Sequence, residues 1–157
     1  MANSEERCEI THGQQVALMS GFLLYCNGGA NVAMLNISNH PSSTWTSAQT
    51  TAAEKLSGFP VVDIPFPKVD PEWTTQDIYN LAQHYLSEYV DLFSHDSCVH
   101  IMGEYTFTYT MVNVLQRCGV DCYAATTVRN TQMLEDGTKL SKFEFVQFRR
   151  YPEMAIK

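Results

Sequence analysis

A polar cluster follows the first clear strand-like run of this sequence and carries side chains suited to chemistry. In LNISNHPSSTW (35–45), an apolar run ends in two asparagines, a histidine, a proline and a group of hydroxyls. The side chains there that could contact a ligand are Ser38, Asn39, His40, Ser42 and Ser43. Amides and hydroxyls both donate and accept hydrogen bonds, and an imidazole titrates near neutrality, where a general base works best. The cluster predicts a binding site for a polar ligand, with His40 as the first candidate for proton transfer.

Two later stretches and one tryptophan add chemistry of the same kind. The further candidates, from MGEYTFT (102–108), ATTVRN (125–130) and the segment before the first helix, are Gly103, Glu104, Thr106, Thr127, Arg129 and Trp45. Glycine permits close backbone approach, and an arginine fork matches phosphate oxygens. Trp45 offers a stacking face for a base, and Glu104 is a second candidate catalytic group that could contact a base or a ribose hydroxyl. The combination favours a nucleotide-like anion over an apolar ligand.

The elements that would position these residues alternate between short strands and helices. Short apolar runs predict strands at 32–38, 59–65, 98–103 and 120–126. Capping residues and one-faced apolar patterns predict helices at 46–56, 74–93 and 106–118. A hairpin should then turn at 135–137, and the spacing of Phe143, Phe145, Val146 and Phe148 predicts a bulge or a mostly buried final strand.

This order of elements predicts an α/β fold with a Rossmann-like three-layer domain. The sheet should be mainly parallel, in the order 2-1-3-4, with a C-terminal antiparallel hairpin at one edge. Ligands of such sheets bind beyond the carboxyl ends of the strands, near the switch point in strand order. The polar loops after the first, third and fourth strands should therefore meet on one rim.

Each candidate residue also has a purely structural explanation. The hydroxyls at 42–47 could serve only as helix caps, and His40 could be a turn residue before Pro41. Glu104 could simply begin a helix, where its charge complements the dipole, and Trp45 could fasten a helix to the sheet. The sequence contains none of the motifs GxGxxG, HExxH and GxSxG and no phosphate-binding P-loop, so it predicts no metal and no cofactor.

Composition narrows the range of partners. The chain of 157 residues carries a net charge of −7, which argues against binding along duplex DNA, where affinity comes from many Lys and Arg contacts. Between Asp63 and Glu104 there are eight acids and one base, a pattern also typical of a solvated acidic helix, whereas seven of the ten bases lie from Arg117 onward.

Cysteine usage and the N-terminal segment bear on location. The five cysteines form no CxxC pair, which favours a reducing compartment, the cytoplasm. The apolar run at 16–26 lacks a positively charged flank and is too short to span a bilayer. It is expected to be a buried strand or helix, and no membrane association is predicted.

Four stretches together resemble a known family. LNISNHPSSTWTSAQ, VVDIPFPKVDP, HIMGEYTFTYTMVNVLQRCGV and FEFVQFRRY are similar to parts of the small CRISPR-associated Rossmann-fold (CARF-like) sensors and ring nucleases of type III systems. The resemblance covers about residues 34–151. It implies a CARF-like domain at 34–157, preceded by an added segment at 1–33 of uncertain role.

The resemblance also implies an activity. Relatives of this kind form homodimers that bind a cyclic oligoadenylate across the two-fold axis, and some cleave it without a metal by attack of a ribose 2′-OH on its own 3′-phosphate. Positioning and charge stabilisation would carry such catalysis. Two other classes stay open: a nucleotide- or sugar-phosphate-binding enzyme that uses the same rim, and a non-enzymatic interaction module.

Overall fold

The computed structural model describes residues 33–89, 92–93, 97–133 and 136–153, together with the backbone of three earlier strands. Those strands are β1 (Ile10–Thr11), β2 (Gln14–Met19) and β3 (Phe22–Asn27). They pair as an antiparallel sheet in the order β1-β2-β3. The described residues of the apolar run at 16–26 therefore lie in strands.

A second sheet has five strands, and their order follows the predicted topology. Its strands are β4 (Met34–Ser38), β5 (Val62–Asp63), β6 (Cys98–Met102), β7 (Asp121–Met133) and β8 (Lys139–Arg150). Their order is β5-β4-β6-β7-β8, parallel except for the antiparallel pair β7–β8. The predicted α/β class, the order 2-1-3-4 and the C-terminal hairpin are confirmed.

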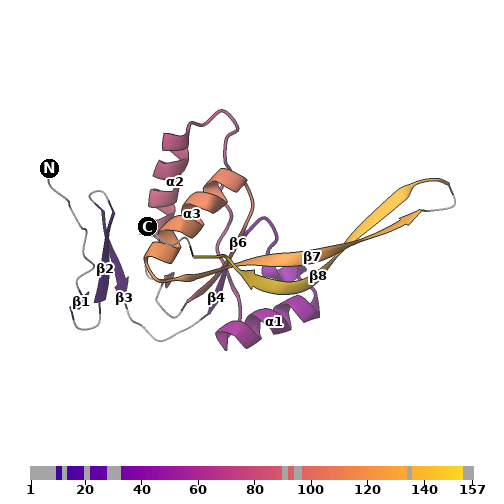
Figure 1. The fold of residues 1–157 in the computed structure, drawn as a ribbon, viewed down its shortest axis with the longest axis horizontal. Helices are drawn as coiled ribbons and strands as arrows, with labels where there is room; N and C mark the ends of the chain where they lie inside the picture. The colour runs from indigo at the N-terminus through magenta and orange to yellow at the C-terminus, as the bar shows by residue number, and fades with distance from the viewer. Residues whose placement is uncertain are drawn as a thin grey trace.

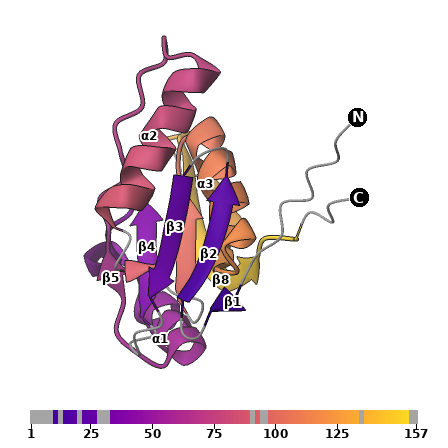
Figure 2. The same ribbon diagram turned by 90° about the vertical axis from the view of Figure 1, so that its left-hand side faces the viewer.

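Three α-helices and a short 3-10 helix pack around this sheet within the described residues. They are η1 (Ser42–Thr44), α1 (Ser47–Ser57), α2 (Thr75–Glu88) and α3 (Tyr105–Arg117). Helices α2 and α3 cover one face of the sheet and α1 lies on the other, as Figures 1 and 2 show. None of the helices in the described ranges is long and apolar enough to cross a membrane.

The alternation of side chains along β4 divides the core between these two faces. Leu35 and Ile37 are buried in the larger apolar cluster with residues of α2 and α3. Met34 points to the opposite face and packs in a smaller cluster with Ala53 of α1 and with Phe148. Because one-residue steps along a strand change face, the same strand serves both layers.

Capping explains where two helices begin. The Thr46 side chain accepts a hydrogen bond from the Gln49 backbone N–H at the start of α1. Thr74 and Asp77 form a reciprocal capping box at the start of α2. Helix α2 was predicted to continue to residue 93, but its α-helical residues end at Glu88.

Two predicted strand boundaries are wrong. The strand predicted at 59–65 is reduced to Val62–Asp63, because the flanking prolines 60 and 65 cannot donate to a ladder. Val62, which the apolar run would place in the core, is 40% exposed. The fourth strand does not end at 126: β7 continues to Met133 because its second half pairs with β8.

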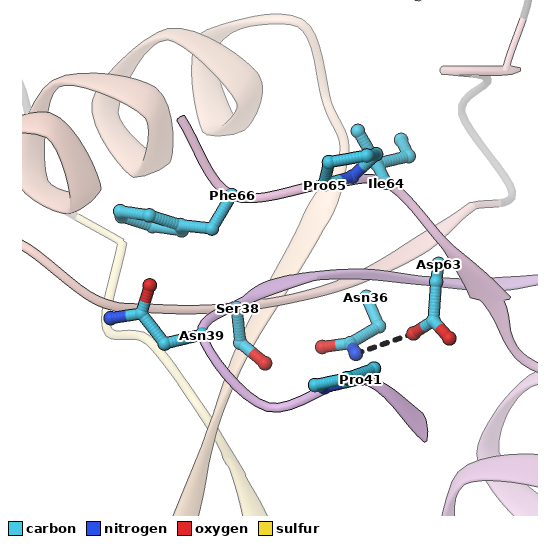
Figure 3. A pocket seen from close by; sticks show the side chains of 8 residues that line it. All are labelled: Asn36, Ser38, Asn39, Pro41, Asp63, Ile64, Pro65 and Phe66. Carbon is cyan, nitrogen blue, oxygen red and sulfur yellow. Dashed lines mark hydrogen bonds between the residues drawn. The ribbon is translucent and has the colours of Figure 1, made fainter. Parts of the chain in front are cut away.

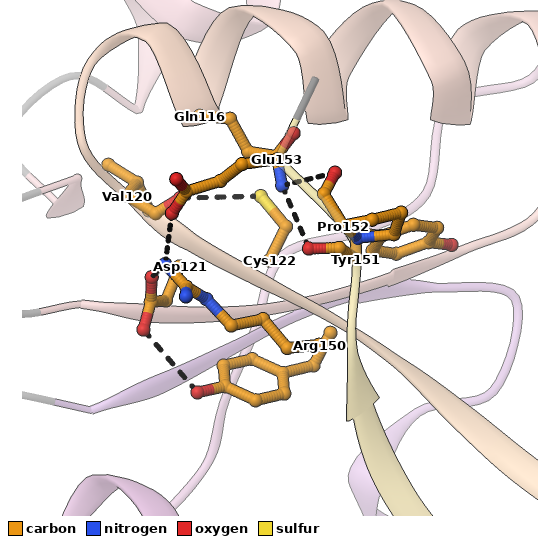
Figure 4. A network of polar contacts seen from close by, with 9 residues as sticks. Gln116, Val120, Asp121, Cys122, Arg150, Tyr151, Pro152 and Glu153 are labelled. Atoms are coloured by element: carbon orange, nitrogen blue, oxygen red, sulfur yellow. Dashed lines mark hydrogen bonds and ion pairs between the residues drawn. The ribbon is translucent and has the colours of Figure 1, made fainter. Parts of the chain in front are cut away.

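The end of β8 is fixed to the body of the domain by polar contacts (Figure 4). Arg150 forms ion pairs with Asp121 at the start of β7 and with Glu153. The Gln116 side chain of α3 donates to the Tyr151 carbonyl over 3.1 Å. These contacts fix the hairpin at its base, while its far end extends away from the helices (Figure 1).

Candidate functional site

A pocket opens at the carboxyl ends of β4 and β5, beside the point where the strand order reverses (Figure 3). Its volume is about 370 Å³. The residues that line it are Asn36, Ser38, Asn39, Pro41, Asp63, Ile64, Pro65 and Phe66. Polar side chains from the end of β4 and apolar ones from the segment after β5 thus share one concavity, in the place where open α/β sheets bind ligands.

Asn36 connects the two strands and the loop around this pocket. It is 1% exposed, and its amide nitrogen donates to Asp63 Oδ1 at 2.7 Å and to the His40 carbonyl at 2.9 Å. Its amide oxygen lies 2.8 Å from His100 Nδ1 on the neighbouring strand β6. Since Asn36 uses both ends of its amide, it holds β5, β4 and β6 in one polar network.

The loop after β4 is organised around the carbonyl of His40. Three donors converge on this oxygen: the Asn36 amide, the Ser38 hydroxyl at 3.0 Å and the Trp45 indole N–H at 3.0 Å. The backbone at residue 40 is therefore fixed, while the residue itself is exposed. This arrangement presents the His40 side chain at the rim on a well-held backbone.

Asp63 is the acidic group of the pocket. Its carboxylate accepts hydrogen bonds from the backbone N–H of Ser42 at 3.0 and 3.1 Å and from the Ser42 hydroxyl at 2.8 Å. Partial burial acts to raise the pKa of Asp63, but the bonds from Asn36 and Ser42 outweigh it, so the pKa lies below its usual value. Asp63 is therefore ionised at neutral pH and gives the pocket a negative charge.

His100 lies beneath the loop as a neutral, buried imidazole. It is 2% exposed, and its ring contacts Trp45 and Phe148 edge-on, with centroid distances of 5.4 and 5.2 Å. Burial, with a smaller contribution from His40, lowers its pKa to about 4. Because the Asn36 amide nitrogen faces Asp63, the Asn36 oxygen faces His100, which assigns the proton to Nδ1. Nε2 has no hydrogen-bond partner among the described residues.

Glu104 serves as the N-cap of α3. Its carboxylate accepts from the backbone N–H groups of Thr106 and Phe107 at 3.1 and 2.8 Å and from the Thr106 hydroxyl at 2.8 Å. These bonds, that from Phe107 first, lower the pKa of Glu104. The N-terminus of α3 therefore carries a carboxylate of the chain itself, as the structural explanation of Glu104 predicts.

Gly103 was expected to allow close approach of a ligand, but in the structure it allows close approach of the Phe66 ring. A Cβ atom at this position would come within 2.2 Å of the ring of Phe66. Phe66 in turn packs edge-on against Phe107, with ring centroids 5.3 Å apart. The space beside Gly103 is thus occupied by a side chain of the pocket wall, and the glycine is explained by packing.

Removal of the Glu104 cap tests its structural role. Glu104→Ala should lower the free energy of unfolding by about 1 kcal/mol, because the first-turn N–H groups of α3 lose their acceptor. Urea denaturation at pH 7 measures this. Glu54→Ala, at an exposed position of α1, is the matched control and should change the value by less than about 0.5 kcal/mol. Equal effects in both variants would contradict the capping role.

The predicted residues separate in the structure into the segment after β4, the hairpin strand β7 and the start of α3, where Gly103, Glu104 and Thr106 lie. Ser38 and Asn39 line the pocket and Ser42 bonds to Asp63, while His40 and Ser43 are exposed beside them. Trp45 packs against His100 and Phe148 and fastens the loop to the sheet. This is the structural alternative to a role in stacking on a base. None of these side chains comes from the fourth strand.

Thr127 and Arg129 belong to the second group. The loop predicted at 125–130 is wrong, because these residues are part of β7 and pair with β8. The Arg129 guanidinium donates to the Ser141 hydroxyl at 2.9 and 3.1 Å and lies 5.7 Å from the centroid of the Phe143 ring. Arg129 is therefore held on the hairpin, away from the pocket walls.

Asp63 was not among the sequence candidates. It stands in VVDIP, which the apolar pattern assigns to a core strand. One signal could have found it: in Rossmann-type sheets an acidic residue about 20 residues beyond the first loop, at the end of the second strand, binds a ribose hydroxyl. Asp63 occupies that position.

Comparison with known proteins places the chain in a family. The model of the Uncharacterized protein MJ1673 family matches residues 32–149. The chain belongs to this family. No curated protein and no solved structure matches it. The segment matched to the MJ1673 family contains all eight pocket residues, the helices of the domain and nearly all of β8, and leaves β1–β3 outside.

The described part of this MJ1673 family member was searched for residues that could bind a metal ion. Among the described residues, no cluster of three or more His, Cys, Asp or Glu side chains could hold an ion. The polar groups that line the pocket are one carboxylate, two amides and one hydroxyl, and the exposed imidazole of His40 belongs to the loop beside it. Such a set can bind hydroxyl and amine groups and can accept a proton.

Proposed function

We propose that the protein binds a cyclic oligoadenylate at this rim, with the ribose of one adenosine directed to Asp63. The observation that carries the proposal is the ionised Asp63 carboxylate at the end of the second strand, in a pocket beside the switch point. This is the position from which acidic residues bind ribose hydroxyls in Rossmann-type sheets. Asn39 and Ser38, which line the same pocket, would complete the hydrogen bonds to the nucleoside.

The same contacts support cleavage of the ring without a metal. The ribose 2′-oxygen attacks its adjacent 3′-phosphate, the 2′-proton passes to the His40 imidazole, and the bond from phosphorus to the 5′-oxygen breaks. The products are a 2′,3′-cyclic phosphate and a 5′-hydroxyl, which takes up a proton. His40 is the group chosen for this transfer because it is exposed at the rim on a backbone held by three hydrogen bonds.

The structure changes the roles assigned to two residues. Glu104 is engaged by the first turn of α3, so the proposal gives it no catalytic part. None of the eight pocket residues is Lys or Arg, so neutralisation of the phosphates must come from elsewhere, and Arg129 lies on the hairpin. Because a ring of several nucleotides exceeds one pocket of about 370 Å³, the proposal includes a cytoplasmic homodimer with two rims facing one ligand.

Binding and cleavage of radiolabelled cyclic tetra- and hexa-adenylate test the proposal. Asp63→Asn should weaken binding about tenfold, the effect of losing one charge-assisted hydrogen bond. His40→Ala should bind normally and lose cleavage about a hundredfold. Glu54→Ala, at an exposed position of α1 that does not line the pocket, is the control and should match the unmodified protein.

Thermal shift with a panel of cyclic and linear nucleotides separates the alternatives, because a ligand that binds only the folded state raises the melting temperature. Stabilisation by a mononucleotide or sugar phosphate, with none by any ring, would replace the proposal with a small-molecule enzyme at the same pocket. If no nucleotide raises the melting temperature, the proposal that the protein binds nucleotides is wrong.

A further inference from the structure

The two ends of the pocket differ in the side chains that line them. Asp63 lies toward one end, and Phe66 and Asn39 both lie toward the other (Figure 3). The volume of about 370 Å³ is near the lower limit for small-molecule sites, so the pocket has room for one nucleoside rather than a whole ring. If the ribose is bound at Asp63, the base of the same nucleoside reaches the end with Phe66 and Asn39.

Asn39 differs from the other polar side chains of the pocket because its amide is free. Asn36 and Asp63 are joined by a hydrogen bond of 2.7 Å, and the Ser38 hydroxyl donates to the His40 carbonyl at 3.0 Å. The Asn39 side chain is exposed and has no hydrogen-bond partner among the described residues. It therefore offers the pocket an unused donor beside an unused acceptor.

Phe66 gives the same end of the pocket a flat apolar wall. A Cβ atom on Gly103 would lie 2.2, 2.4 and 2.7 Å from three adjoining carbons of the Phe66 ring. Distances this similar place the glycine over a face of the ring rather than beyond its edge. The ring also packs at 84° to that of Phe107, and it is only partly buried. Its neighbours therefore fix its orientation, while part of its surface lines the pocket.

An aromatic wall and a free amide are together suited to a nucleobase. Any base can stack on an aromatic ring, because every base has a π face. An asparagine amide adds selectivity, since its oxygen accepts from the N6 amino group of adenine while its NH₂ donates to N7. A base with an oxygen at position 6 loses one of these two bonds. The pair of side chains therefore favours adenine.

We propose that Phe66 and Asn39 form an adenine subsite, in which the Phe66 ring stacks on the base and the Asn39 amide binds N6 and N7. This inference rests on the proposed function, because it takes the ribose of the same adenosine to be bound at Asp63. It adds the residues that select the base. The contact to Asp63 cannot do so, because every ribonucleotide carries the same sugar.

Packing alone gives a different expectation for the same residues. Phe66 would then serve only to fill the space beside Gly103 and Phe107, and Asn39 would be a solvated loop residue. In that case neither side chain affects the choice of base. An adenine subsite predicts two distinct effects, because stacking does not depend on the group at position 6, whereas the amide bond does.

Titration calorimetry on the full chain separates these effects with two ligands, cyclic tetra-adenylate and cyclic tetra-inosinate, in which hypoxanthine replaces adenine. The unmodified protein should bind the adenylate ring at least tenfold more tightly, the discrimination typical of a base read by an amide. Asn39→Ala should weaken binding of the adenylate ring and reduce the preference to less than about threefold. Phe66→Leu should weaken both rings about tenfold and keep the preference.

Phe59→Leu is the matched control, because Phe59 is 45% exposed and does not line the pocket, and it should bind both rings like the unmodified protein. Circular dichroism verifies that each variant is folded, and if Phe66→Leu is not, the two titrations of Asn39→Ala decide alone. Equal affinity of the unmodified protein for the two rings, or an unchanged preference in Asn39→Ala, would overturn the subsite but not ring binding. If the unmodified protein binds neither ring, the proposed function is wrong and the subsite with it.

Discussion

Replacement of Asn36 with alanine should lower the free energy of unfolding by about 3 kcal/mol, although it removes no apolar core contact. The variant leaves His100 Nδ1–H without its acceptor at a position that is 2% exposed. It also removes the 2.7 Å bond to the ionised Asp63 and one of three donors to the His40 carbonyl. Leaving a buried polar group without a partner costs more free energy than the lost hydrogen bond contributed. The unsatisfied groups should therefore account for most of the destabilisation.

Urea denaturation at pH 7 measures the effect, and Asn39→Ala provides the matched control. Asn39 is the same residue type three positions further on, in the loop after β4, but it is exposed, so its replacement should cost less than about 0.5 kcal/mol. The difference in unfolding free energy between the two variants separates the contribution of the buried hydrogen-bond network from that of the neighbouring loop. A loss below about 1 kcal/mol for Asn36→Ala would mean that the network does not hold the three strands together.

The sheet order could be predicted because local pattern and general chirality both act on it. Short apolar runs separated by amphipathic helices leave few topologies, and right-handed crossovers select one of them. The side-chain spacing near the end of the chain also carried real information. The pattern left open a bulge or a mostly buried final strand. Val146 is the residue without a partner between Phe145–Thr127 and Gln147–Thr126, so the structure contains the bulge, and β8 is mostly exposed.

The extent of β7 could not be predicted in the same way. Residues 126–130 are polar and resemble a rim loop when considered alone. They form a strand because β8 supplies partners 12 to 21 residues later, from Lys142 to Gln147. Strand formation that depends on a distant partner leaves little trace in the local sequence. Because a loop was predicted where β7 continues, Thr127 and Arg129 were assigned to the rim, whereas the structure places them on the hairpin.

The site was predicted in position but only partly in content. Topology alone places the loops after β4 and β6 on one edge, and Ser38 and Asn39 do line the pocket. Which polar groups are free to bind a ligand depends on internal partners, which sequence does not show. Glu104 is engaged by its own helix, and the space beside Gly103 is filled by the Phe66 ring. Asp63 also accepts bonds from Asn36 and Ser42, but it lines the pocket, in a segment that the apolar pattern assigns to the core.

Acidification should destabilise the protein by about 2 to 3 kcal/mol between pH 7.5 and pH 4.5, chiefly through His100. Its pKa falls from a usual 6.5 to about 4 in the folded state, so over this interval the unfolded chain binds a proton that the folded chain refuses. The contribution of neutral His100 is complete above about pH 6.5 and is lost progressively as the pH falls toward 4. Asp63 and Glu104 have lowered pKa values and retain their charge over most of this window.

Urea unfolding at a series of pH values tests this dependence, with His100→Asn as the comparison. Asparagine can still donate a hydrogen bond toward Asn36 but cannot titrate, so the variant should be less stable at pH 7.5 yet lose much less on acidification. His84→Asn is the matched control, because His84 is 70% exposed in its side chain and lies on the outer face of α2. If His84→Asn flattens the profile and His100→Asn does not, the buried imidazole is not the group that makes stability depend on pH.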